Sequence, residues 1–137
     1  MKKFLTVTLL IIICISLIAC NKVDGSGAWE NATYLNDEEF GDGSTTIYVV
    51  VAAQDQSVTF TINTDKATVG DALIEHKLIA GEESAYGLYI KVVNGITADY
   101  DVDQSYWAFY INGEYAMSGV DTTNITAGAT YKLEYTK

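Results

Sequence analysis

The segment from Tyr106 to Tyr115, YWAFYINGEY, constrains the fold more than any other part of the chain. Aromatic and β-branched residues dominate residues 106–111, a composition typical of β-strands. Asn112-Gly113 follows, and this dipeptide readily takes the two left-handed conformations of a tight hairpin turn. The segment therefore predicts a strand, a turn and a returning strand.

Both faces of the predicted strand carry aromatic side chains. Because side chains alternate along a strand, Trp107, Phe109 and Ile111 share one face, and Tyr106 and Tyr110 share the other. One face must meet the core, which leaves the other for solvent or a ligand. The alternation favours Trp107 in or near the core, although the reverse register, with Trp107 exposed, is also open. In the favoured register, a tyrosine platform on the uncovered face would comprise Tyr48, Tyr89, Tyr106 and Tyr110.

Two more strands and a helix are predicted before this segment. Residues 45–53 (TTIYVVVAA) and 57–63 (SVTFTIN) have the composition of strands, and Gln54-Asp55-Gln56 between them indicates a hairpin. Thr68 and Asp71 have the spacing of a capping-box variant, which predicts a helix of about nine residues.

The remaining strands complete the predicted domain. Residues 86–93 form a strand that turns at Asn94-Gly95, and residues 130–136 form the last strand. The order is β-β-α-β-β-β, which predicts an α+β fold: a β-grasp-like mixed sheet with one helix packed on one face. We expect this domain to span residues 44–137.

The N-terminus has the pattern of a bacterial lipoprotein signal peptide. Met1-Lys2-Lys3 precedes an apolar run at residues 4–17 that is too short for a comfortable membrane span. Leu17-Ile18-Ala19-Cys20 resembles the lipobox, so residues 1–19 would be removed and Cys20 lipidated. The alternative is an ordinary signal peptide with an accidental late cysteine. The lipid would anchor the protein to the cell membrane on the extracytoplasmic side.

The segment that follows the predicted lipid anchor has the composition of a linker. Residues 20–43 are rich in Gly, Asn, Asp and Glu and predict a lipidated cysteine with an acidic tether. Trp29, Tyr34 and Phe40 are unusual in a linker and allow the second half of the tether to dock on the domain.

The charge of the chain makes nucleic acid a poor partner. The net charge is −10, and loss of Lys2 and Lys3 with the signal peptide would leave an even more acidic protein. Such a surface repels phosphate backbones.

The sequence contains no recognisable catalytic arrangement, so we do not expect an enzyme. His76 is the only histidine, and it falls on the apolar stripe of the predicted helix, which favours a packed or rim position. The carboxylates of Asp99, Asp101 and Asp103 alternate, as in some calcium loops. An EF-hand would need Gly at Gln104 and Glu at Tyr110, so a solvated acidic loop is favoured over a weak cation site, and no metal site is predicted.

Several motifs together resemble the transcobalamin-like C-terminal domain family, whose members include small bacterial surface domains. The resemblance spans about residues 45–136 and implies a fold similar to the C-terminal β-domain of the vertebrate cobalamin carriers. The motifs are Tyr106-Trp107-x-Phe109, Asn112-Gly113, Gly119-Val120-Asp121, Ile125 and Tyr131-Lys132-Leu133-Glu134-Tyr135.

The resemblance implies a ligand and a role. It implies a cell-surface lipoprotein that binds cobalamin or a related corrinoid, with no other cofactor, and delivers it to a transporter. In the carriers, a helical barrel forms the second jaw around the ligand, and this chain has none, so tight binding would need a second protein or a second copy. The alternative is a protein-interaction or adhesion module without a small-molecule ligand. The expected ligand-binding residues are Tyr106, Trp107, Tyr110, Asn112 and Tyr115.

Overall fold

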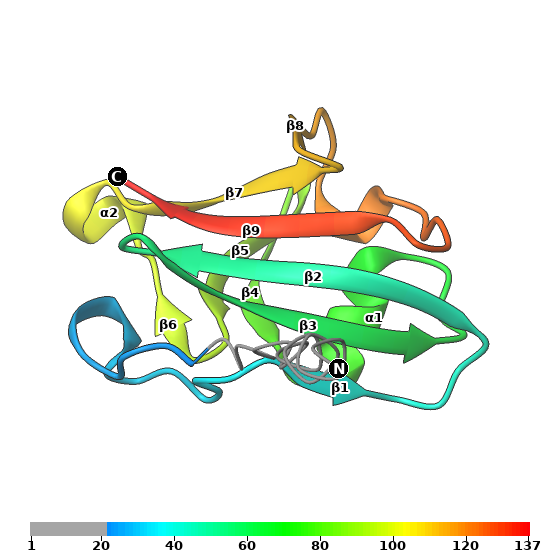
Figure 1. Cartoon of the computed structure of the whole chain (residues 1–137). Helices are drawn as coiled ribbons and strands as arrows, with labels where there is room; N and C mark the ends of the chain where they lie inside the picture. The colour runs from blue at the N-terminus through cyan, green and yellow to red at the C-terminus, as the bar shows by residue number, and fades with distance from the viewer. Residues whose placement is uncertain (1–21) are drawn as a thin grey trace, which may run out of the picture.

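The computed structural model describes residues 22–137 of the chain (Figure 1). The predicted signal peptide, residues 1–19, and the predicted lipidation site, Cys20, lie outside the described residues. Within residues 22–137, no helix has both the length and the apolar composition needed to cross a membrane.

A six-stranded mixed sheet forms one layer of the fold (Figure 1). Its strand order is β1-β3-β2-β9-β7-β8. Two neighbouring pairs, β1 with β3 and β2 with β9, are parallel, and the other pairs are antiparallel. The strands are β1 (Glu38–Phe40), β2 (Thr45–Ala53), β3 (Gln56–Thr64), β7 (Tyr106–Ile111), β8 (Glu114–Tyr115) and β9 (Thr130–Thr136).

Two tight turns set the hairpins of this sheet. Asn112 and Gly113 between β7 and β8 have φ values of 48° and 85°. Gln54 and Asp55 between β2 and β3 have φ values of 49° and 63°. Left-handed conformations at both central residues match the twist of the flanking strands. Both predicted hairpins are therefore confirmed.

A smaller sheet and helix α1 lie on one side of the large sheet (Figure 1). The predicted strand at residues 86–93 corresponds to β5, which belongs to this separate sheet of order β4-β5-β6 and not to the large sheet. Thr68 caps α1, because its hydroxyl accepts the backbone N–H of Asp71 at 3.2 Å. The elements are α1 (Val69–Glu75), β4 (Ile79–Ser84), β5 (Gly87–Val93), β6 (Ile96–Thr97), α2 (Tyr100–Asp103) and the 3₁₀ turns η1 (Gly27–Trp29) and η2 (Val120–Thr122).

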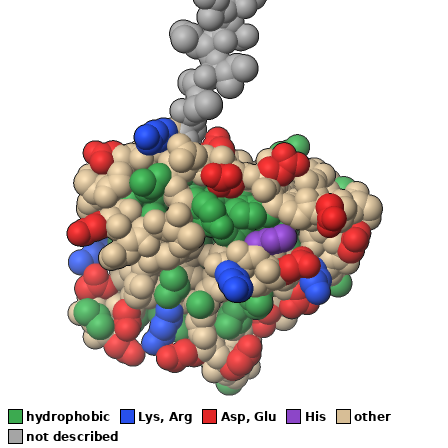
Figure 2. All heavy atoms as spheres, turned by 90° about the horizontal axis from the view of Figure 1, so that it is seen from below, with side chains coloured by type: hydrophobic (Ala, Val, Ile, Leu, Met, Phe, Trp, Pro, Cys, Tyr) green, Lys and Arg blue, Asp and Glu red, His purple; other side chains and the backbone are tan. Residues whose placement is uncertain are grey.

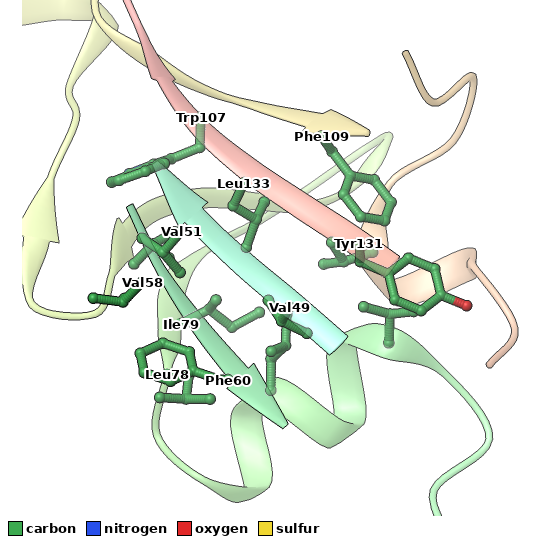
Figure 3. Close-up of a cluster of buried hydrophobic side chains, with 14 of the residues drawn as sticks. Val49, Val51, Val58, Phe60, Leu78, Ile79, Trp107, Phe109, Tyr131 and Leu133 are labelled. Carbon is green, nitrogen blue, oxygen red and sulfur yellow. The ribbon is translucent and has the colours of Figure 1, made fainter. Parts of the chain in front are cut away.

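The hydrophobic core lies between the large sheet and the layer made by α1 and the small sheet. Trp107 and Phe109 point into the core and are only 8% and 9% exposed, so the favoured register of β7 is confirmed. The α+β class, with a mixed sheet and a helix packed on one face, is confirmed as well. Figure 3 shows side chains from four strands, Val49, Val51, Val58, Phe60, Trp107, Phe109, Tyr131 and Leu133, together with Leu78 and Ile79.

The predicted tether needs correction, because residues 22–43 form a strap that packs on the domain. Trp29 is 1% exposed, and its indole N–H donates to the carbonyl of Ala53 at 2.9 Å. Val23 is also buried in the core, and β1 pairs with β3. The folded unit therefore includes residues 22–43 as well as residues 44–137, since the apolar residues of the segment find partners on the sheet.

His76 is a packed rim residue, as predicted. Its ring stacks on Phe40 with centroids 5.4 Å apart and planes 28° from parallel. In Figure 2, the histidine lies beside a small hydrophobic patch on a face with many carboxylates. The His76 side chain thus joins the strap to the end of α1.

Candidate ligand-binding groove

A groove of ≈ 650 Å³ opens at the edge of the large sheet where β7 meets β8. We call it the Trp107 groove. The buried rings of Trp107 and Phe109 form its floor, and exposed side chains form its rim: Tyr86 (97% exposed), Tyr115 (62%) and Met117 (98%). The remaining lining residues are Ala116, Ser118, Gly119 and Thr122.

The floor of the groove is fixed by contacts within the core. The indole N–H of Trp107 donates to the carbonyl of Lys91 at 3.2 Å, and Tyr135 packs edge-on against the indole with centroids 5.7 Å apart. Phe109 stacks on Tyr131 at a centroid distance of 6.1 Å. A ligand would therefore meet a preformed aromatic surface.

Asp121 fixes the wall of the groove opposite β8. Its carboxylate accepts the backbone N–H of Leu88 at 3.0 Å and so joins η2 to the start of β5. Gly87 has a φ of +100°, and a Cβ atom there would lie 2.6 Å from an Asp121 oxygen. Neighbouring Val120 is buried in the core. The Gly119-Val120-Asp121 motif thus brings the hairpin carrying Tyr86 to the groove.

The groove brings together two of the five predicted ligand-binding residues, Trp107 and Tyr115. The strand register pairs Tyr110 with Tyr115, so both rings lie on the face of the sheet away from the core, edge-on at 5.6 Å, and Tyr115 borders the groove only at its edge. Asn112 has a structural role, because its side-chain oxygen accepts the backbone N–H of Thr130 at 2.9 Å. Tyr106 lines a separate hollow.

The predicted tyrosine platform does not form as one surface. The strand register places Tyr48, Tyr106 and Tyr110 on the face of the large sheet away from the core. Tyr89 lies in β5 of the small sheet. The prediction of this platform was wrong, because the pattern of residues 86–93 predicts a strand but does not indicate which sheet the strand joins.

Sequence reasoning missed two rim residues, Tyr86 and Met117. Tyr86 lies at the tip of the hairpin between β4 and β5, and Met117 lies in the loop after β8. The predicted strand at residues 86–93 includes Tyr86 as its first residue, whereas β5 begins at Gly87, and Met117 belongs to no alternating pattern. The available signal was the presence of large apolar side chains in short segments next to Gly87 and Gly119, where the chain turns and cannot bury them.

The acidic stretch before β7 uses two of its carboxylates to fold a short helix. Asp99 accepts the N–H of Asp101 at 3.1 Å at the start of α2. Hydrogen bonds from the Ser105 hydroxyl and backbone N–H, with a smaller contribution from Lys137, hold the pKa of Asp103 below its ordinary value of 3.8. Among residues 22–137, no group of three or more His, Cys, Asp or Glu side chains is placed to hold a metal ion.

Comparisons with known proteins find a matching family model and solved structures with a similar fold. The family model described as "Domain of unknown function (DUF4430)" matches residues 66–137, just over half of the chain. A crystal structure from Ruminococcus gnavus, described as a "putative metal binding protein", is 32% identical, with a TM-score of 0.65. That match covers 69% of this chain and 98% of the other. No curated protein matches the chain.

A crystal structure of haptocorrin in complex with Cbi shares the fold at 20% identity and a TM-score of 0.52. The match covers 72% of this chain but only 26% of haptocorrin, so this chain corresponds to about a quarter of that protein. The family match, supported by the 32% identical relative, shows that the chain belongs to the DUF4430 family, the transcobalamin-like family.

Proposed function

We propose that this protein is a cell-surface lipoprotein that binds cobalamin or a related corrinoid in the Trp107 groove and delivers it to a transporter. The observation that carries the proposal is the groove itself, with a fixed aromatic floor and an exposed apolar rim on a transcobalamin-like domain. The haptocorrin structure, which holds cobinamide (Cbi), supports the choice of ligand. In this proposal the protein carries its ligand and catalyses no reaction.

The chemistry of the groove suits the edge of a corrin ring, which carries methyl groups and amide side chains. The rings of Trp107 and Phe109 and the flexible thioether of Met117 offer apolar contact, and Tyr115 borders the groove at its edge. The hydroxyls of Ser118 and Thr122 lie in the same lining and offer hydrogen bonds to amides. Of the other predicted residues, Tyr110 contributes by supporting the ring of Tyr115.

The groove covers only one side of such a ligand, so the affinity of the isolated chain is expected to be weak. Burying about 200 Å² of apolar corrin surface at roughly 25 cal/mol per Å² gives about 5 kcal/mol before the costs of association. Even before those costs, this contact alone corresponds to a dissociation constant of only about 0.2 mM. A second protein or a second copy would have to cover the other side for tight binding.

The proposed cell-surface location depends on lipidation of Cys20. Metabolic labelling with a fatty-acid analogue tests it, because the full chain would incorporate the label and the Cys20→Ala variant would not. Equal labelling of both proteins would overturn the anchoring part of the proposal.

Titration of residues 22–137 with cobinamide and with cyanocobalamin tests the ligand. We expect saturable heat in calorimetry and a shift of the corrin absorbance band. Tyr115→Ala should weaken binding, because it removes an exposed rim side chain without touching the core. Tyr48→Ala is the matched control, since Tyr48 is also an exposed tyrosine of the large sheet. No heat and no spectral change at millimolar ligand would overturn corrinoid binding by this chain and favour a protein partner.

A further inference from the structure

A second hollow, of ≈ 480 Å³, is lined by Tyr89, Tyr100, Asp101 and Tyr106. We call it the Tyr106 hollow. Its side chains come from three separate elements, β5, α2 and β7. It shares no lining residue with the Trp107 groove. The chain therefore gathers three phenol rings and one carboxylate at a place that the proposed function does not use.

Helix α2 holds two of the lining residues in position. Ser105 is buried; its hydroxyl accepts the N–H of Asp99 at 3.1 Å and donates to the carboxylate of Asp103. These contacts fasten both ends of the single helical turn. The turn projects Tyr100, which is 53% exposed, and Asp101 away from the core.

The polar groups of the hollow are available to a ligand. Within residues 22–137, the Asp101 carboxylate and the hydroxyls of Tyr89, Tyr100 and Tyr106 make no hydrogen bond or ion pair. No ring contact joins any two of the three tyrosines in this part of the chain. The space between the three rings is thus accessible to a small ligand.

The electrostatic surroundings of the hollow favour a cation. The nearby cation is Lys91, whose ammonium group is paired with Glu82 at 3.2 Å. The hydrogen bond to Glu82 raises the pKa of Lys91, and the negative charges of Asp99 and Asp101 add to this effect. Among residues 22–137, Asp101 forms no ion pair of its own, so its negative charge favours a further cation at the hollow.

We propose that the Tyr106 hollow binds an organic cation of the quaternary or methylated ammonium class. The faces of Tyr89, Tyr100 and Tyr106 would contact its methyl groups, and Asp101 would balance its charge. Tyrosine faces attract cations through the ring quadrupole, and aromatic cages of this composition suit methylated ammonium groups. A methylated ammonium suits the three rings, because its methyl groups bring the positive charge into contact with the ring faces.

An NMR titration of residues 22–137 in sodium phosphate buffer tests this inference, with choline compared against 3,3-dimethyl-1-butanol. The two molecules have nearly the same shape, and only choline is charged. We expect choline to shift the signals of the four lining residues saturably and to bind about tenfold more tightly than the neutral alcohol. Equal affinity for both molecules, or no saturation by choline up to about 100 mM, would overturn the proposal.

Variants of exposed residues separate the contributions. Tyr100→Ala should weaken choline binding at least about twofold. Tyr100→Phe should bind choline as the parent does, because the ring face is kept. Asp101→Asn should weaken binding of choline and leave the alcohol unaffected. Tyr115→Ala, in the Trp107 groove, should leave choline binding unchanged, so this test is independent of corrinoid binding. If none of the variants in the hollow alters choline binding, the site is not the one proposed.

Discussion

Removal of the Trp29 side chain should destabilise the whole domain, although residues 20–43 have the composition of a linker. The Trp29 ring is 1% exposed, and its indole N–H donates to Ala53 at the end of β2 at 2.9 Å. Trp29→Ala would therefore leave a large cavity beneath the strap and remove a hydrogen bond that ties the strap to the sheet.

The expected loss of stability is large compared with the stability of a domain of this size. Replacing a buried tryptophan by alanine costs about 3–5 kcal/mol, out of about 5–15 kcal/mol for a typical domain. Trp29→Phe keeps most of the apolar contact but removes the donor to Ala53. Its cost is expected at about 1–3 kcal/mol.

Urea unfolding of residues 22–137, followed by far-UV circular dichroism, measures both losses without depending on tryptophan fluorescence. Tyr86→Ala is the matched control, because Tyr86 is a large aromatic residue that is 97% exposed, and we expect a change within about 0.5 kcal/mol. A loss below about 1 kcal/mol for Trp29→Ala would refute the reasoning and return residues 22–43 to the role of a tether.

Three further perturbations follow from single contacts. Asp121→Ala removes the acceptor of the Leu88 N–H. It should lower the free energy of unfolding in urea by about 1–3 kcal/mol and weaken corrinoid binding in the groove. An unchanged unfolding free energy together with an unchanged corrinoid affinity would contradict the role given to Asp121. Gly113→Ala should cost about 1–2 kcal/mol, because Gly113 has a φ of +85° and open space around a Cβ atom, so the loss is conformational alone; equal stability would contradict this. Hydrogen bonds from Ser105 lower the pKa of Asp103. The stabilising contribution of the carboxylate is therefore complete above 3.8, its ordinary pKa, and is lost as the pH falls through the lower pKa of the folded state. Asp103→Asn should lose less stability than the parent between about pH 4 and pH 2, and equal losses of unfolding free energy in the two proteins would refute the assignment.

Local chemistry explains the parts of the fold that were predicted from sequence. The hairpin turns at Gln54-Asp55 and Asn112-Gly113 depend on residues adjacent in the chain, and the cap of α1 depends on Thr68 and Asp71. The register of β7 follows from alternation against a core that needs Trp107 and Phe109. Such features are contained in short windows of sequence.

The parts of the fold that were not predicted depend on contacts between segments far apart in the sequence. The strand at residues 87–93 joined the small sheet because it pairs with β4, a segment whose largely exposed residues give no strand pattern. The strap was predicted as a tether because its composition is polar, although Trp29, Tyr34 and Phe40 allowed its second half to dock on the domain. Its few apolar residues, above all Trp29, nevertheless find buried places on the sheet.

The candidate site was predicted in part for the same reason. Trp107 and Tyr115 belong to one hairpin, so their proximity follows from local structure. The rim formed by Tyr86 depends on the contact of Asp121 with Leu88, across 33 residues of sequence. No short pattern in the sequence encodes that contact.

The pairing of β1 with β3 makes the strap one edge of the large sheet and changes how far the groove would stand from a membrane. β1 and β8 are the two opposite edges of the six-stranded sheet (Figure 1), and strands about 4.8 Å apart give such a sheet a width of about 24 Å. If a lipid is attached at Cys20, three residues before Val23, the connection spans at most about 10 Å even when fully extended. The strap edge would then stay close to the bilayer, and the groove would lie at the other edge, the width of the sheet away.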